Sequence, residues 1–372
     1  MADDKSPCIW TNKPGHFGRL QVYNYLDNRM IQGDVVMTGR EHFNKIMSRT
    51  SNQSGFWHGA PFGENVDCMY DYFGTEPNHN ALGTALGDCC HWVMPEAHGM
   101  WQHMEGVQMF NSLHNEGGVF AECEDVRDVE RFPWPDVKYC DFTESEKAVD
   151  ETIRQGKAVL SGTWACFFHN VADFFGMENY FIKMYTDPAV VEAVTERVVD
   201  FYLQINEKWF DIIGDRMDAI FFGNDFGSQL DLLISPDMFD KFVLPYFKKI
   251  TSQAKTRGYK VMLHSCGAIE SVIPRLIDAG VDGLHPIQAK ARNMEAATLA
   301  RKYGKDIVFM GGVDTQDLLP FGTPQQVNDE VMRLRELLGP NFIVSPSHEA
   351  MPNTPPRNME AMARAAAKGL SR

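Results

Sequence analysis

A histidine and a cysteine stand two positions apart in His264-Ser265-Cys266, directly after the short apolar run Lys260 to Leu263. In an extended segment, side chains two positions apart point to the same side. An imidazole and a thiolate together form a donor pair that favours zinc. Taken alone, the pair favours a buried cysteine beside a hydrogen-bonded histidine over a zinc site, so further ligands are needed to support the metal interpretation.

A third candidate ligand, His348, follows the last apolar run of the chain, Phe342 to Val344. It lies far along the chain from Cys266, and only a closed sheet would bring the two side chains together. Three protein ligands with one open position are typical of a catalytic zinc site, whereas structural zinc sites have four protein ligands. If the sheet is closed, the sequence predicts a catalytic zinc site. Without that argument, His348 is a surface histidine beside the start of a helix.

Polar and small residues also follow other apolar runs. Asp225 comes after the run Ala219 to Phe222, and we expect it to carry a proton or to orient a ligating histidine. Glu349, next to His348, is the other candidate proton carrier or a fourth zinc ligand. The alternative to a catalytic role for Asp225 is that it caps its own loop. The candidate substrate-binding residues are Trp57, His58, Asn224, Gly311 and Gly312. For these, the alternatives to substrate binding are turns or core packing.

The elements that must position these residues are visible from about residue 158 onward, where short apolar runs alternate with segments of helical periodicity. This alternation predicts successive βα units and a parallel sheet. Several helix starts are marked by a capping residue followed by proline, as in Ser235-Pro236 and Thr323-Pro324. The six expected strands are 158–168, 219–222, 260–263, 283–286, 307–310 and 342–344.

Six such strands fit either an open doubly wound sheet or a closed (βα)8 barrel of the TIM type. We expect the barrel, with a first strand in Ser54 to Trp57, because the loops after barrel strands open on one face where the chemistry lies. Residues 1–54 are predicted to form a helical extension, with the best helical period in Arg40 to Met47, and residues 55–372 to form the barrel. An insertion around 64–150 is expected to include a hairpin over the barrel mouth, built from Trp92-Val93-Met94 and Val119-Phe120-Ala121.

Composition excludes several classes of protein. Hydrophobic residues make up 44% and charged residues 23% of the 372 residues, as in an ordinary globular protein. The net charge of -15 disfavours nucleic acid or an anionic membrane surface as a partner. No stretch approaches the roughly 18 apolar residues of a membrane span. The start of the chain lacks the apolar run of a signal peptide, so we expect a cytoplasmic protein with reduced cysteines.

The order of the motifs from about residue 217 to 365 resembles that of the uroporphyrinogen decarboxylase superfamily, and within it the zinc-dependent corrinoid methyltransferases. The segments that carry the resemblance are Asp225-Phe226-Gly227, Ile234-Ser235-Pro236, His264-Ser265-Cys266-Gly267, Gly311-Gly312-Val313-Asp314, and Ser345-Pro346 through Thr354-Pro355-Pro356-Arg357-Asn358. The resemblance implies a (βα)8 barrel, a zinc ion, and a corrinoid (cobalamin) carried by a separate protein that docks over the barrel mouth. A cobalamin-ligating Asp-x-His-x-x-Gly run is absent from the chain, which agrees with a separate carrier.

Two branches of that superfamily differ in their chemistry. The decarboxylases use no metal and hold a substrate with eight carboxylates through an arginine-bearing N-terminal segment. Here Arg40 is the one obvious arginine near that place, and its setting is typical of the start of a surface helix. The thiol-methylating members carry a second cysteine where this chain has His348. An imidazole in place of a thiolate leaves less negative charge on zinc, which favours an oxygen-bearing substrate over a thiol.

The resulting hypothesis is an O-demethylase-like methyltransferase that moves a methyl group from a small O-methylated substrate, an aryl methyl ether first, to the cobalt(I) of a corrinoid protein. Zinc would polarise the substrate oxygen and make it a better leaving group. The alternatives are a metal-free decarboxylase, a thiol methyltransferase or a lyase on the same scaffold, and a zinc-binding or corrinoid-handling protein without catalysis. A homo-oligomer is compatible with the sequence.

Overall fold

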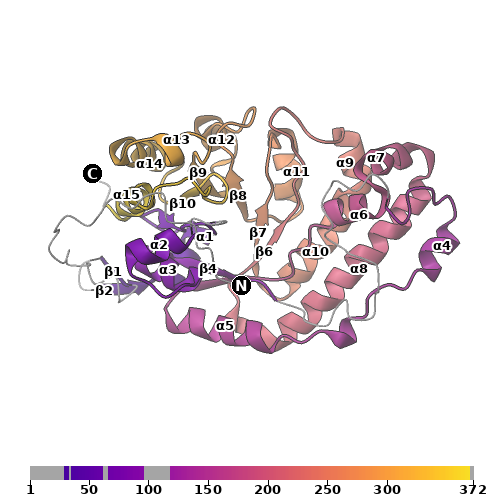
Figure 1. Ribbon diagram of the computed structural model, residues 1–372, viewed down its shortest axis with the longest axis horizontal. Helices are drawn as coiled ribbons and strands as arrows, with labels where there is room; N and C mark the ends of the chain where they lie inside the picture. Colours follow the sequence, from indigo (N-terminus) through magenta and orange to yellow (C-terminus); the bar gives the residue numbers. More distant parts are fainter. Residues whose placement is uncertain (1–28, 33–34, 62–65, 96–117, 369–372) are drawn as a thin grey trace, which may run out of the picture.

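Eight parallel strands form a barrel in the computed structural model, which describes residues 29–32, 35–61, 66–95 and 118–368 (Figure 1). Their order around the barrel is β3, β10, β9, β8, β7, β6, β5 and β4. The bounds are β3 Gly55–Phe56, β4 Cys90–Val93, β5 Ala158–Ser161, β6 Ala219–Gly223, β7 Lys260–His264, β8 Gly283–Ile287, β9 Val308–Val313 and β10 Phe342–Pro346.

The ends of this sheet meet, because the amide of Cys89 donates to the carbonyl oxygen of Phe56 at 2.9 Å, between β4 and β3. This single backbone hydrogen bond nearly closes the ring. The predicted (βα)8 barrel is therefore confirmed, and the open doubly wound sheet is wrong.

Helices surround the strands on the outside of the barrel (Figure 1). Their starts follow the expected signals: Ser235 accepts from the Met238 amide at the start of α9, and Thr323 forms a capping box with Gln326 at the start of α14. The helices are α1 Gly39–Met47, α2 Val66–Phe73, α3 His79–Leu86, α4 Val126–Arg131, α5 Thr143–Arg154, α6 Phe167–Phe175, α7 Met177–Thr186, α8 Pro188–Ile213, α9 Pro236–Phe242, α10 Leu244–Thr256, α11 Ile273–Asp278, α12 Ala296–Tyr303, α13 Leu318–Phe321, α14 Pro324–Leu338 and α15 Pro356–Ala367.

The strands are buried on both faces, as in parallel sheets generally. Phe222 of β6 packs outward against Phe247 of α10, with ring centroids 5.4 Å apart, whereas its neighbour Phe221 belongs to the cluster inside the barrel. Phe43 and Ile46 of α1 belong to the same inner cluster. Helix α1 therefore fills the amino end of the barrel, and the interior is left to open at the carboxyl ends of the strands.

The N-terminal part differs from its prediction. Where a helical extension was expected, β1 Arg29–Gln32 pairs antiparallel with β2 Val35–Thr38. The helix expected over Arg40 to Met47 is present as α1. Residues 1–28 lie outside the described residues, and the domain boundary expected at residue 54 stays a prediction.

The hairpin expected over the barrel mouth is wrong. Trp92 lies in β4, which is the second barrel strand and pairs in parallel with β5, Trp92 opposite Leu160. Phe120 lies in a turn, where its amide donates to the carbonyl oxygen of Phe174. The run expected to be one strand from Ala158 onward ends at Ser161, and α6 begins after a short loop.

Two further expectations concern cysteines and membranes. Cys68 is disulfide-bonded, so the expectation of reduced cysteines is wrong for this residue. The remaining cysteines of the described ranges are free thiols: Cys89, Cys90, Cys123, Cys140, Cys166 and Cys266. Among the helices that the structure describes, none is both long and apolar enough to cross a membrane.

Candidate metal centre and cavity

The three predicted zinc ligands lie together at the mouth of the barrel. His264 ends β7, Cys266 follows in the next loop, and His348 follows β10. One donor atom from each of the three lies within 4.8 Å of the others. Because β8 and β9 separate β7 from β10 in the sheet, the curvature of the closed barrel is what brings His348 to the other two.

The spacing of the donors suits zinc. The Cys266 sulfur lies 3.3 Å from Nε2 of His264. Tetrahedral zinc with ordinary bond lengths separates a nitrogen and a sulfur ligand by about 3.6 Å. In the described part of the chain, this is the one group of three such side chains whose donor atoms come so close. The residues present therefore fit a zinc ion with three protein ligands.

Burial sets the ionisation of the candidate ligands. It lowers the pKa of His264, against the smaller opposing effect of Asp225, so the imidazole is neutral and has a free lone pair. Burial also raises the pKa of the Cys266 thiol well above its usual range, and the Asp225 carboxylate adds to this rise. A divalent cation deprotonates a thiol that it binds, so zinc binding here would release a proton.

Asp225, in the loop after β6, holds the ligand loop in place. Its Oδ1 accepts a hydrogen bond from the Cys266 amide at 2.8 Å and lies 3.6 Å from Nε2 of His264. Burial raises the pKa of this carboxyl, but His264, the Cys266 amide and two further histidines together outweigh burial, and the net pKa is lowered. Asp225 is therefore a carboxylate in contact with the segments that carry two candidate ligands.

A cavity of about 280 Å³ opens beside the three ligands. Its walls are largely aromatic, with Trp92 and Trp164 4.9 Å apart between ring centroids and Trp164 5.3 Å from His264. Glu349 also lines it, and burial raises the pKa of this carboxyl, against the opposing effect of His348. The lining residues are Trp57, Gly59, Ala60, Trp92, Trp164, Phe221, His264, His285, His348 and Glu349.

Two residues expected to bind substrate make their side-chain hydrogen bonds away from the cavity. His58 is buried, and its Nδ1 lies 2.6 Å from Oδ2 of Asp88, whose Oδ1 accepts from the His58 amide. The side chain of Asn224 accepts from the Phe168 amide and donates to the carbonyl oxygen of Ala165. Neither residue is among those that line the cavity, and Asn224 instead fixes the loop between β5 and α6.

The two glycines expected at the cavity lie inside β9 rather than after it. Both have positive φ, 123° for Gly311 and 93° for Gly312. A Cβ on Gly311 would lie 2.6 Å from the amide nitrogen of Ile287 in β8. The close backbone approach that we expected is therefore to a neighbouring strand, and neither glycine lines the cavity.

Sequence reasoning missed most of the cavity wall. His285 is a polar residue within the otherwise apolar strand β8, and that contrast was the available signal. Trp92 belongs to a strand that was misassigned, and Trp164 lies in a loop after β5. Phe221 was placed in a strand, but only the closed barrel decides that its side chain points inward.

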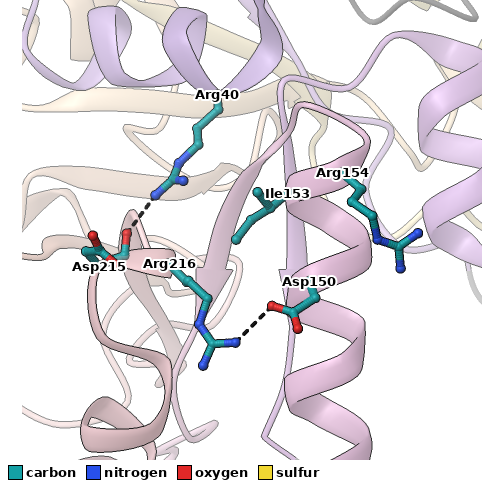
Figure 2. Close-up of a pocket in the computed structure, with 6 residues that line it drawn as sticks. All are labelled: Arg40, Asp150, Ile153, Arg154, Asp215 and Arg216. Carbon is teal, nitrogen blue, oxygen red and sulfur yellow. Dashed lines mark hydrogen bonds and ion pairs between the residues drawn. The ribbon is translucent and has the colours of Figure 1, made fainter.

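A second pocket, of about 490 Å³, lies at the opposite end of the barrel, next to the segments that precede β6 (Figure 2). Its charged groups bind one another: Arg40 donates to the Asp215 carbonyl oxygen, and Arg216 donates to the Asp150 carboxylate, both at 2.8 Å. Arg40 also contacts both carboxylate oxygens of Asp218. Basic residues thus gather here, whereas the described residues that line the mouth cavity include no arginine or lysine.

Comparison with known proteins agrees with this fold. Residues 95–369 match the uroporphyrinogen decarboxylase (URO-D) family, and the chain belongs to this family. The expected resemblance is thereby confirmed. A solved methyltransferase from Methanosarcina mazei shares the fold, with a TM-score of 0.63 and 15% sequence identity over 89% of this chain and 98% of the other.

Two curated relatives are methyltransferases. The chain is 28% identical over 191 residues to a methylated-thiol–coenzyme M methyltransferase of Methanosarcina mazei, which is 51% of this chain and 48% of the relative. It is 23% identical over 199 residues to a methylcobamide:coenzyme M methyltransferase of Methanosarcina acetivorans, 52% of this chain and 53% of the relative. The chain thus spans about half the length of the curated relatives it matches.

Proposed function

We propose that this protein is a zinc-dependent methyltransferase. In this proposal a methyl group passes from a small O-methylated donor, an aryl methyl ether in the first instance, to the cobalt(I) of a corrinoid carried by a separate protein. The observation that carries the proposal is the group of His264, Cys266 and His348 at the wall of an aromatic cavity. The methyltransferase names of both curated relatives support methyl transfer, and one of those names includes a methylcobamide.

The ligand set supports an oxygen donor. Zinc bound by His264, Cys266 and His348 would supply a Lewis acid with one position left for a further ligand. With a single thiolate among the three ligands, the metal would keep more of its positive charge than it would beside two thiolates. A more positive zinc ion favours the harder oxygen atom over sulfur.

The residues of this chain supply the remaining functions. Glu349 lines the cavity next to His348, so its carboxyl group is placed to carry a proton to the substrate oxygen. When the bond between the methyl carbon and the oxygen breaks, the oxygen keeps the electron pair, and Glu349 transfers a proton to it. The corrinoid of the partner protein, as cobalt(I), would supply the electron pair for the new bond to the methyl carbon. Asp225 keeps the ligand loop in place through the Cys266 amide.

The size and the walls of the cavity favour a small aromatic donor. A volume of about 280 Å³ lies near the lower limit of small-molecule pockets, so it suits a single ring. Trp57 and Phe221 meet edge to face, with ring centroids 6.1 Å apart, and Trp92 stands at a similar angle to Phe221. These flat apolar surfaces would exclude water from the ring of a bound aryl ether.

The mouth of the barrel also supports the proposed partner. Leu230, in the loop after β6, has 63% of its surface exposed, and Met351, shortly after β10, has 47% exposed. Both residues lie in loops that follow the carboxyl ends of strands, on the side of the cavity. Exposed apolar side chains at a mouth are suited to the docking of another protein. We therefore propose that the corrinoid protein binds over this face.

Metal content tests the proposal first. Elemental analysis of the purified protein should find about one zinc per chain, and Cys266→Ala should lose it, because the site would keep two of three ligands. Cys140→Ala, at another free cysteine, is the matched control and should keep its zinc. Circular dichroism should show the same barrel in all three proteins, since the core does not depend on the mouth residue.

Methyl transfer is the second measurement. Zinc-loaded protein, mixed with anisole and a cobalt(I) corrinoid, should produce methylcobalt absorbance, and the Cys266→Ala variant should not. A wild-type protein without zinc, purified under reducing and chelator-free conditions, would refute the zinc mechanism. A protein that binds zinc but transfers no methyl group from any O-methylated donor would instead be a zinc-binding protein without this catalysis.

A further inference from the structure

His285 is a buried histidine in the wall of the cavity that the zinc ligands do not include. It lies in β8, and only 4% of its surface is exposed. Its ring stands edge-on to the rings of Trp57 and Phe221, at centroid distances of 5.2 and 5.7 Å. A polar ring in such an apolar setting needs hydrogen-bond partners. One of its two nitrogens has such a partner, and the other has none within the described part of the chain.

The first nitrogen contacts a candidate zinc ligand. Nδ1 of His285 lies 3.0 Å from Nδ1 of His264, a distance that requires one proton between the two atoms. Nε2 of His264 is the atom that faces the Cys266 sulfur. If this Nε2 binds the metal, its lone pair is used there and the proton of His264 lies on Nδ1. His264 then donates, and His285 accepts at Nδ1 and carries its own proton on Nε2.

The second nitrogen has no partner. Nε2 of His285 is buried and makes no hydrogen bond within the described part of the chain. A buried N–H group without an acceptor is unfavourable, and a ligand that supplies an acceptor removes that cost. His285 lines the cavity but its Nε2 is covered there, so an occupant supplies this acceptor after a small shift of the cavity wall. An oxygen atom accepts such a hydrogen bond well, whereas a thioether sulfur is a weak acceptor.

We propose that His285 is a positioning and specificity residue with one role for each ring nitrogen. Nδ1 fixes the tautomer and orientation of the zinc ligand His264, and the Nε2–H group donates to the oxygen of the methyl donor and so selects oxygen over sulfur. This inference rests on the proposed function, because both roles require zinc on Nε2 of His264. It adds His285 to the proposed site and gives a second reason, besides the zinc ligands, for a preference for oxygen donors over sulfur donors.

Three substitutions separate the two roles. His285→Asn keeps an amide oxygen near the position of Nδ1 but leaves nothing near the position of Nε2. His285→Gln reaches the position of Nε2 with an amide N–H but has no acceptor near Nδ1. His285→Phe fills the space of the ring and supplies neither group. Circular dichroism of each variant shows whether the barrel is retained.

Zinc affinity, measured by competition with a chelator, tests the positioning role without any turnover. We expect His285→Asn to bind zinc like the wild type, and His285→Gln and His285→Phe to bind it about 10- to 100-fold more weakly. Replacing zinc with cobalt(II) provides a second readout, because the visible spectrum should change only in the two weaker variants. Wild-type affinity and spectrum in His285→Phe would overturn the positioning role.

Binding of anisole and thioanisole by the zinc-loaded protein, measured calorimetrically without a corrinoid, tests the selection role. The wild type should prefer anisole, and His285→Asn, which holds zinc equally well, should lose roughly 3- to 10-fold of that preference. An unchanged preference in His285→Asn would overturn this role. If the wild type itself holds no zinc, the proposed function and this inference both fail; if it holds zinc and His285→Phe matches it in both assays, only this inference fails.

Discussion

Lys157, just before β5, is a fully buried lysine whose charge is costly to the fold. Its Nζ donates to the carbonyl oxygen and to Oδ1 of Asn80, at 2.6 and 2.7 Å, and it forms no ion pair with any residue that the structure describes. Burial lowers the pKa of Lys157 from 10.5 to about 8. At 1.36 kcal/mol per unit, this shift corresponds to a cost of about 3 kcal/mol in the free energy of folding at neutral pH.

The sign of the pH dependence follows from proton binding. Below pH 8 the lysine is charged in both states, and the full cost is present. Between pH 8 and 10.5 the folded protein has lost this proton while the unfolded chain keeps it, so the unfolded state binds more protons and stability rises with pH. Above pH 10.5 both states are neutral, and the cost is gone.

Lys157→Met removes the charge and keeps an unbranched side chain. Urea unfolding at a series of pH values gives the difference in free energy of unfolding between wild type and variant. This difference should move in favour of the wild type by about 3 kcal/mol between pH 7 and 10.5. Lys45→Met, at an exposed lysine, measures the effect of the substitution itself, which is then subtracted. A difference that stays constant over this range would refute the reasoning.

Two further substitutions test the packing of the barrel. Gly223→Ala would place a Cβ 2.2 Å from the Trp164 ring, so Trp164 should leave the cavity wall and phenol binding, measured calorimetrically, should weaken by about 10-fold; unchanged binding would contradict the role of this wall. Arg335→Met should lower the free energy of unfolding in urea by about 2 to 3 kcal/mol, because this buried side chain donates to a serine hydroxyl and two backbone carbonyls that would lose their partner. A loss below about 0.5 kcal/mol would show that water satisfies those acceptors.

The regular half of the barrel was predictable from the sequence, and the irregular half was not. The strands from Ala158 onward alternate with helices that carry clear start signals, and the structure contains each of them. β4 was not predictable because it has four residues, two of which are His91 and Trp92, and its pairing with β5 is a long-range contact. A short strand without a distinctive pattern is defined only by its neighbours in the sheet.

The residues of the candidate site also fall into those that the sequence predicts and those that it does not. Sequence reasoning placed His264, Cys266 and His348 together because the carboxyl ends of barrel strands share one face. It did not find His285 or Phe221, because the direction of a side chain on a buried strand depends on the register and curvature of the sheet. It also assigned Gly311 to a ligand, whereas its missing Cβ makes room for the backbone of β8. The occupancy of the site by zinc stays a prediction.

The nearly closed ring has a consequence for how the cavity deforms. β3 has only two residues, and one backbone hydrogen bond joins it to β4, so this seam is a weakly paired part of the barrel wall. Trp57 directly follows β3 and Trp92 lies within β4, so two aromatic walls of the cavity stand on either side of the seam. Small shifts at the seam would therefore change the distance between these walls, while β7 is paired along its whole length with β6, and β10 along its whole length with β9. The candidate metal ligands thus stand on longer strand pairings than the one that joins these two aromatic walls.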